Sequence, residues 1–87
     1  MIDSISIKEV KNKLGDLCRQ HRQRYGMSQE DLGEALGISR YTIQNFESGN
    51  NATLDTFLKI AKHFDLMDDF YRALNNIADA NNLDSMY

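Results

Sequence analysis

The stretch covering residues 28–49, SQEDLGEALGISRYTIQNFESG, constrains the fold of this chain more than any other part of the sequence. Ser28 is a preferred type of residue for capping a helix start, and two leucines follow it one helical turn apart. Gly37 can adopt the positive φ that ends a helix, and Ser39 can cap a second helix directly afterwards. The stretch therefore predicts two short helices joined by a glycine turn.

The second of these helices divides into an apolar and a polar face. Ile43 and Phe46 point toward the core, whereas the polar side chains at the start of the helix point elsewhere. Gly33 leaves room for another helix to pack closely on the first helix. Two helices that cross over so short a turn form a helix-turn-helix, a motif that places its second helix in the DNA major groove.

The polar face carries side chains that can read bases. Arg40 can make a bidentate contact to guanine, and Gln44 or Asn45 can pair with adenine. Tyr41 can lie against a thymine methyl group or donate to a phosphate. We therefore expect base contacts to come from the start of this helix.

Length and composition predict one small domain without catalytic chemistry. The chain has 87 residues and a single cysteine, Cys18, so an internal disulfide is excluded and a reducing cytoplasm is expected. The sequence shows no signal-peptide pattern and no apolar run long enough to span a membrane. His21 and His63 do not form a cluster with metal-ligand spacing, and no glycine-rich phosphate loop is present. We expect neither an enzyme, nor a bound metal, nor a cofactor.

The charge distribution is polarised along the chain. The net charge is −3, which by itself argues mildly against a nucleic-acid partner. Residues 1–26, however, hold six lysine and arginine residues against three acidic ones, whereas residues 66–87 hold one arginine against four aspartates. A basic leading helix and an acidic tail indicate few phosphate contacts and a shallow salt dependence.

The rest of the sequence predicts an all-α fold of five helices. Proline is absent, and Ser6, Ser28, Ser39 and Thr53 each stand at a junction as an N-cap. We expect helices over about residues 7–24, 54–63 and 67–79, a single domain over 1–87 with its core at about 7–66, and a frayed tail at 80–87. The expected inward residues are Val10, Leu14, Leu17, Cys18 and His21 in the first helix and Leu54, Phe57, Leu58 and Ala61 in the fourth.

The fifth predicted helix carries an apolar arc that is wide for a terminal helix of a small domain. We expect part of it to pack on the first helix and part to meet a second copy, because so small a core gains stability from oligomerisation. The candidate residues for a dimer contact are Met67, Phe70, Tyr71, Leu74 and Ile77.

Residues 14–66 resemble the Cro/cI-type (XRE) family of helix-turn-helix regulators from phages and bacteria. The resemblance runs through MSQEDLGEALGISRYTI, continues in FESG, and ends in TLDTFLKIAK. It implies a compact five-helix, lambda-repressor-like DNA-binding domain with the helix-turn-helix at its second and third helices. It also implies that Arg22, late in the first helix, pairs with Glu47 at the end of the third helix, which is the recognition helix that enters the DNA groove.

By the same resemblance, one set of residues faces the bases and another faces the DNA backbone. The family carries Lys or Arg beside the glycine that follows the recognition helix, where this chain has Asn50, and the loop here is one residue shorter and lacks proline. Free N–H groups at helix starts and in this loop suit phosphate oxygens. The expected base-reading residues are Ser39, Arg40, Tyr41, Gln44 and Asn45, and the expected backbone contacts are Ser28, Gln29, Thr42, Asn50, Asn51 and Thr53.

Two functions remain open from the sequence. The first is a sequence-specific regulator that binds double-stranded DNA, acting as a homodimeric repressor on an inverted-repeat operator. The alternative is a protein-interaction module, such as an antitoxin, whose main partner is a toxin bound through the fifth helix and the acidic tail. Substitutions in the recognition helix and in the fifth helix would distinguish these two functions.

Overall fold

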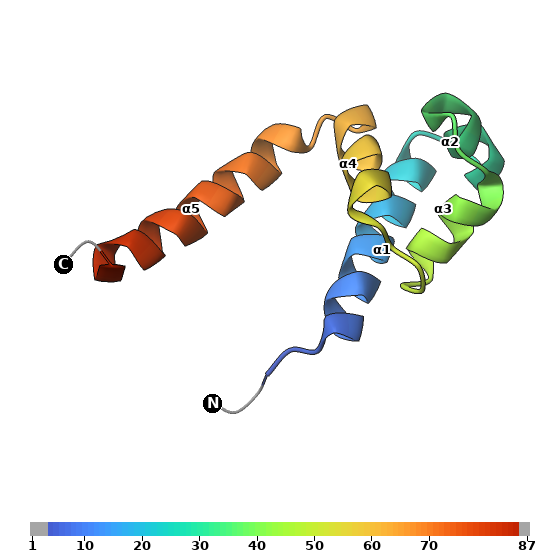
Figure 1. Ribbon diagram of the computed structural model, residues 1–87. Coiled ribbons are helices and arrows are strands. Elements are labelled where there is room, and N and C mark those ends of the chain that lie inside the picture. The colour runs from blue at the N-terminus through green and yellow to red at the C-terminus, as the bar shows by residue number, and fades with distance from the viewer. Residues whose placement is uncertain (1–3, 86–87) are drawn as a thin grey trace.

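The computed structural model describes residues 4–85, with side chains described as far as residue 80. This part of the chain folds into five α-helices and contains no strand (Figure 1). The all-α architecture predicted from the helical spacing is therefore confirmed. The helices are α1 (Ile7–Arg24), α2 (Gln29–Leu36), α3 (Arg40–Glu47), α4 (Leu54–His63) and α5 (Met67–Ser85).

Side-chain caps begin the first four helices at the predicted positions. The Ser28 hydroxyl accepts a hydrogen bond from the backbone N–H of Asp31 at 2.9 Å, and Ser39 accepts one from Thr42 at 3.0 Å. Ser6 and Thr53 do the same at the starts of α1 and α4. Each such cap stabilises its helix by about 1 kcal/mol, which explains why the caps predicted these boundaries well.

The core lies where α1, α2, α3 and α4 meet. Its most completely buried side chains are those of Leu32, Ile43, Phe46 and Cys18, and Ile60 and Phe64 from α4 and the turn after it complete the cluster. The prediction that Ile43, Phe46 and Cys18 face inward is confirmed. Since α3 contributes two of these side chains, its orientation is fixed by the core.

Two glycines allow the backbone segments to approach one another closely. A Cβ atom at Gly33 would lie 2.7 Å from the carbonyl oxygen of Ile38, so this glycine admits the turn that leads into α3. A Cβ atom at Gly15 would lie 2.5 Å from the carbonyl oxygen of Glu47, so α1 touches the end of α3 there. Gly37 has a φ of 72°, as predicted for the residue that ends α2.

The predicted inward faces of α1 and α4 need correction at three positions. Val10, Leu54 and Leu58 are exposed, the first two by 49% and 70%. In α4 Ala61 is buried as predicted, and Thr56 and Ile60 are buried as well, because this helix is rotated so that the Thr56–Ile60 side meets the core. The apolar stripe of α4 is wider than the side that the four-helix body covers.

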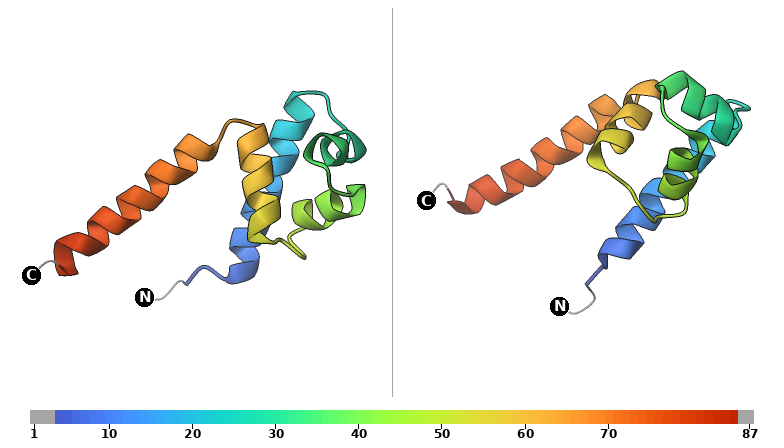
Figure 2. Two further views of the ribbon diagram at one scale, coloured as in Figure 1. Left: turned by 45° about the horizontal axis from the view of Figure 1, so that its top comes forward. Right: turned by 45° about the vertical axis from the view of Figure 1, so that its right-hand side comes forward.

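α5 leaves the four-helix body as a projecting arm (Figure 2). Its first turn packs on α4, where the rings of Phe57 and Phe70 meet edge to face at 4.7 Å. Residues 71–80 are all exposed, so the expectation that part of α5 packs on the first helix is wrong. The predicted end of this helix at residue 79 is also wrong, because it continues to Ser85; residues 86–87 of the predicted tail lie outside the described part.

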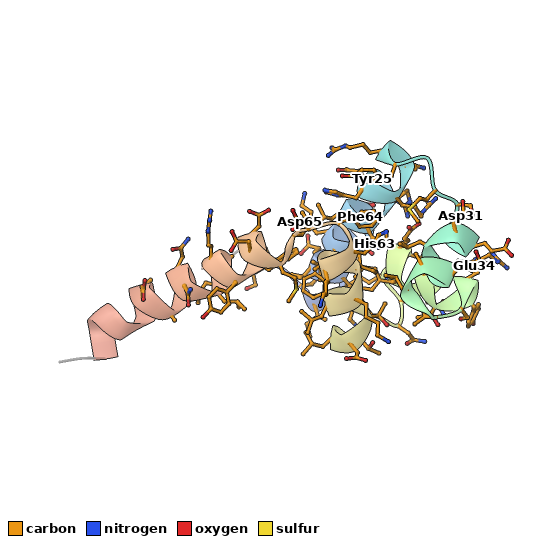
Figure 3. All side chains as sticks on the ribbon, turned by 90° about the horizontal axis from the view of Figure 1, so that it is seen from above. Tyr25, Asp31, Glu34, His63, Phe64 and Asp65 are labelled. Carbon is orange, nitrogen blue, oxygen red and sulfur yellow. The ribbon has the colours of Figure 1, made fainter. Side chains whose placement is uncertain are left out.

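A small aromatic cluster closes the body near the turn between α4 and α5. The rings of Tyr25 and Phe64 stack with their centroids 5.6 Å apart, and His63 meets Phe64 from the other side (Figure 3). Asp65 follows with a φ of 61°, which turns the chain away toward α5. In residues 4–85, no helix combines the length and the apolar character needed to cross a membrane.

Candidate nucleic-acid interface

The first half of α3 presents a polar face to solvent. Arg40, Tyr41 and Gln44 are exposed, Asn45 is half-buried, and the opposite side of the helix is anchored by fully buried Ile43. The predicted base-reading residues therefore lie on one accessible face of a helix that the core holds in place. A short helix with this division can enter a groove without losing its packing.

Hydrogen bonds within α3 organise part of this face. The Arg40 Nη1 atom donates to Gln44 Oε1 at 3.4 Å, so these two side chains lie side by side one turn apart. The Ser39 hydroxyl lies 2.8 Å from the Thr42 hydroxyl and also caps the helix. Ser39 and Thr42 are thus partly occupied within the protein, whereas Arg40 retains most of its donors.

The start of α2 lies next to α3. Ser28 caps α2 and Gln29 is its first residue, so both side chains lie at this helix start. The backbone N–H of Ser28 donates to Asp31 at 2.9 Å, which completes a reciprocal capping box. This backbone hydrogen bond, together with the Ser28 hydroxyl, lowers the pKa of Asp31 below its ordinary value. The carboxylates of Glu30 and Asp31 partly oppose an anion at this helix start.

The loop between α3 and α4 contacts a lysine side chain of α1, and the sequence pattern did not reveal this contact. The Lys8 Nζ atom, from the first turn of α1, donates to the carbonyl oxygen of Gly49 at 2.8 Å and to Asn50 Oδ1 at 3.3 Å. Asn50, Asn51 and Thr53 are exposed along this loop. Lys8 thus supplies a positive charge beside the position where the resembling family carries Lys or Arg.

A buried ion pair braces α3 against α1, as the resemblance implied. The Arg22 Nε atom lies 2.6 Å from Glu47 Oε2, and Arg22 Nη2 donates to Glu47 Oε1 at 2.9 Å. The two residues are only 9% and 3% exposed. Arg22 also donates to the carbonyl oxygen of Met27, so the same guanidinium fixes the chain before α2. Glu47 is therefore the point that joins α1, α2 and α3.

Three further side chains surround the Glu47 carboxylate, and one of them is Arg19, whose Nε atom lies 3.8 Å from Oε1. The Gln29 amide donates to Glu47 Oε1 at 3.1 Å, and the Cys18 thiol donates to Oε2 at 3.5 Å. Burial raises the pKa of Glu47, but the hydrogen bonds from Arg22, Gln29 and Cys18 outweigh it and hold this pKa below its ordinary value. Gln29 is therefore held by the core at the edge of the candidate interface, with a second N–H still free to donate outward.

The same environment makes Cys18 a structural residue. Burial first, and then the neighbouring Glu47 carboxylate, raise the pKa of its thiol to about 12.

Among the described residues, no three His, Cys, Asp or Glu side chains gather in a way that could hold a metal ion.

Sequence reasoning missed Lys8, Gly15 and Arg19. Arg19 Nη2 donates to the backbone carbonyl of Glu47 at 3.0 Å and so satisfies the end of α3. All three residues meet α3 or the loop after it from α1, across about thirty to forty positions of sequence. The excess of lysine and arginine in residues 1–26 indicated a basic leading helix but not which of its side chains reach the loop.

A family model supports this description. The model described as helix-turn-helix (HTH_3) matches residues 19–67, more than half of the chain. The chain belongs to this helix-turn-helix family. The match begins in the second half of α1, contains α2, α3 and α4, and ends at the first residue of α5, so nearly all of the arm lies beyond it.

Curated relatives match the helix-turn-helix domain over a similar length. A candidate HTH-type transcriptional regulatory protein of Methanoregula boonei is 46% identical over 50 residues, and one of Methanoculleus marisnigri is 48% identical over 50 residues. In both cases the match covers 58% of this chain but only 16% of the relative. The chain thus corresponds to about a sixth of the length of these proteins.

A solved structure resembles a larger part of the chain. In a complex of a HipB variant with an O2 20mer, the HipB chain is 33% identical in sequence, with a TM-score of 0.58. The match covers 76% of this chain and 88% of that chain. This similarity agrees with the fold assignment, and the two chains are of comparable size.

Proposed function

We propose that this chain is a sequence-specific transcriptional regulator that binds double-stranded DNA, with α3 lying in the major groove. The observation that carries the proposal is the exposed face formed by Arg40, Tyr41 and Gln44 on a helix whose opposite side is fully buried. A guanidinium and an amide on a fixed helix can make the paired hydrogen bonds that distinguish base edges. Membership of the helix-turn-helix family supports the same use of α3.

Backbone contacts in this proposal come from both sides of α3. Ser28 and Gln29 approach one phosphate region from the start of α2, and Asn50, Asn51 and Thr53 approach another from the following loop, beside the Lys8 ammonium. Polar side chains and helix starts of this kind fix the register of a protein on DNA. Ser39, Thr42 and Asn45 complete the contact surface around the base-reading residues.

The regulator acts as a homodimeric repressor on an inverted-repeat operator in this proposal. Two copies of α3 would enter successive major grooves about 34 Å apart, the spacing common to helix-turn-helix dimers. A protein held there blocks a nearby promoter by occupying it. The exposed stripe of Met67, Tyr71, Leu74 and Ile77 on α5 supports an association between copies.

Selection of bound duplexes from a random pool at about 0.1 M salt tests the proposal. The wild-type chain should enrich a two-fold-symmetric motif, and the double variant Arg40→Ala/Gln44→Ala should lose it. A matched control removes an arginine and an amide from the exposed arm, as Arg72→Ala/Asn75→Ala. This control should enrich the same motif as the wild type.

The second candidate function is a protein-interaction module, with a toxin as the partner of α5 and DNA contact secondary. The observation behind it is the same exposed stripe on α5, together with the acidic character of this helix. It predicts that Phe70→Asp/Leu74→Asp abolishes activity while Arg40→Ala/Gln44→Ala has no effect. An unenriched duplex pool would therefore argue against DNA reading, and the two double variants would then test this function.

A further inference from the structure

Two apolar hollows adjoin α1, and one of them extends to the start of α4. One hollow of about 400 Å³ is lined by Ile5, Val10 and Leu14, and a neighbouring one of about 260 Å³ is lined by Leu14, Leu54 and Phe57. Leu14 lines both hollows, so they adjoin at this side chain. We call Val10, Leu14, Leu54 and Phe57 the hollow face.

The apolar stripe of α5 begins at the hollow face and then runs away from it. Phe70 packs on Phe57, and Leu74 and Ile77 follow on the same side of the helix at intervals of three to four residues. We call Met67, Phe70, Tyr71, Leu74 and Ile77 the arm stripe.

Beyond the contact of Phe70 with Phe57, the arm stripe does not cover the hollow face of its own chain. From Phe70 to Ser85 the helix extends by roughly 22 Å at about 1.5 Å per residue, directed away from the body (Figure 1). Leu74 and Ile77 remain 63% and 59% exposed, and Val10 and Leu54 remain exposed across the open angle. Both halves of a packing interface are thus present in one chain but are held apart.

We propose that two copies exchange their arms, so that the arm stripe of each copy packs on the hollow face of the other. The proposal deepens the homodimer of the proposed function, on which it rests, by naming the surface that receives α5. It differs from a dimer in which the two α5 helices pair only with each other. Each such dimer contains two equivalent contacts between an arm stripe and a hollow face.

Charge supports a second copy as the occupant. Lys13 lines the first hollow and Lys11 the second, and neither makes an ion pair within residues 4–80. The arm carries Asp68, Asp69 and Asp79 against a single arginine in its described part. A negative arm laid along the positive first half of α1 therefore gains favourable electrostatic contacts, whereas two negative arms laid together repel each other.

The exposed area is also of the size that a dimer needs. The exposed apolar side chains of the arm stripe and the hollow face present roughly 700 Å² per copy, close to the ~800 Å² per partner of a standard interface. The arm stripe by itself leaves Met67, Tyr71, Leu74 and Ile77 exposed, and a contiguous apolar patch of this kind marks an interaction site. Reciprocal exchange covers both parts of it at once.

Sedimentation velocity on the full chain at about 50 µM tests the exchange. Leu74→Asp places a charge in the arm stripe, and Val10→Asp/Leu54→Asp places charges in the hollow face. Because all three positions are exposed, far-UV circular dichroism should show unchanged folds. Each variant should weaken dimerisation at least tenfold, whereas Asn76→Asp, which adds the same charge on the opposite side of α5, should not.

A mixing experiment separates exchange from pairing between the arms. Leu74→Asp retains an intact hollow face, and Val10→Asp/Leu54→Asp retains an intact arm. An equimolar mixture can therefore form a dimer with one intact contact, which neither variant can form alone. We expect the mixture to dimerise more strongly than either component.

Three results would overturn the exchange. A monomeric wild type would show that no second copy occupies the hollow face, and a normal dimer of Val10→Asp/Leu54→Asp would show that this face is not used. Failure of the mixture to gain dimer over its components would exclude the reciprocal contact. The duplex selection reads α3 independently, so loss of the exchange with retained enrichment would leave the proposed DNA function intact.

Discussion

Removing one partner of the Arg22–Glu47 pair should destabilise the domain far more than removing an exposed ion pair. Glu47→Ala leaves the Arg22 guanidinium 9% exposed with only the Met27 carbonyl as a remaining hydrogen-bond acceptor. Breaking a buried pair in this way costs about 3–5 kcal/mol of the free energy of unfolding. Since a domain of this size has a total of about 5–15 kcal/mol, the variant is expected to approach the limit of stability.

Thermal and urea unfolding followed by circular dichroism measure this effect. A loss of about 3 kcal/mol corresponds to a decrease in Tm of roughly 12–24 °C for a domain of this length. Asp16→Ala is the control, because the Arg19–Asp16 pair has a similar N–O distance of 2.8 Å but side chains that are 40% and 56% exposed. Its removal should cost less than about 1 kcal/mol.

The double variant Arg22→Met/Glu47→Met tests the reason for the loss. Apolar side chains of similar length remove both charges, so no uncompensated charge remains buried. Its stability should therefore lie well above the sum of the two single losses, and within about 1–2 kcal/mol of the wild type. Additive losses, or a Glu47→Ala variant no less stable than Asp16→Ala, would refute the argument.

The pH dependence follows from the lowered pKa of Glu47. The ordinary value is 4.5, and the folded value lies below it, so the unfolded chain takes up the proton first as the pH falls. The stabilisation is fully present above about pH 4.5 and is lost as the pH falls through the folded pKa. Wild-type stability should decrease over this range, and the double variant should lack that part of the decrease.

Two further predictions concern contacts that α1 makes with α3 and with the loop after it. Lys8→Ala should weaken binding to all duplexes alike and reduce the salt slope by about one, as measured by fluorescence anisotropy, whereas Lys13→Ala should change both less. An equal effect of the two substitutions would show that the position of Lys8 at the loop is unimportant. Gly15→Ala should lower stability by about 1–3 kcal/mol or more in urea unfolding, because the new Cβ atom would lie 2.5 Å from the Glu47 carbonyl oxygen. Unchanged stability would mean that α1 and α3 can separate without cost.

Local signals predicted the four-helix body well and the outer apolar residues poorly. Caps such as Ser28, Ser39 and Thr53 act within one turn, so the sequence alone locates them. The exposure of Val10 and Leu54 depends instead on how far the neighbouring helices extend. A helical apolar stripe shows that a face is to be covered, but it does not show whether the same chain covers it.

The candidate site also has one part that local sequence signals predict and another part that only the packing of the helices determines. The exposed positions of Arg40, Tyr41 and Gln44 follow from helical periodicity once Ile43 and Phe46 are placed inward. The contact of Lys8 with the Gly49 carbonyl joins residues that lie far apart in the chain, so only the packing of α1 on α3 creates it. No local pattern distinguishes this lysine from its neighbours on α1.

Glu47 links the stability of the domain to the placement of its candidate DNA contacts. One carboxylate oxygen receives both Arg22 and Gln29, so the hydrogen bond that positions Gln29 at the edge of α2 depends on the same buried group that braces α3. Arg40 and Gln44 lie outside this network and are exposed. Substitutions at these two positions should therefore change DNA recognition with little loss of stability, whereas substitutions at Glu47 should reduce both. The structure thus separates the candidate base-reading side chains from those that hold α3 in place, with Gln29 as the point of contact between them.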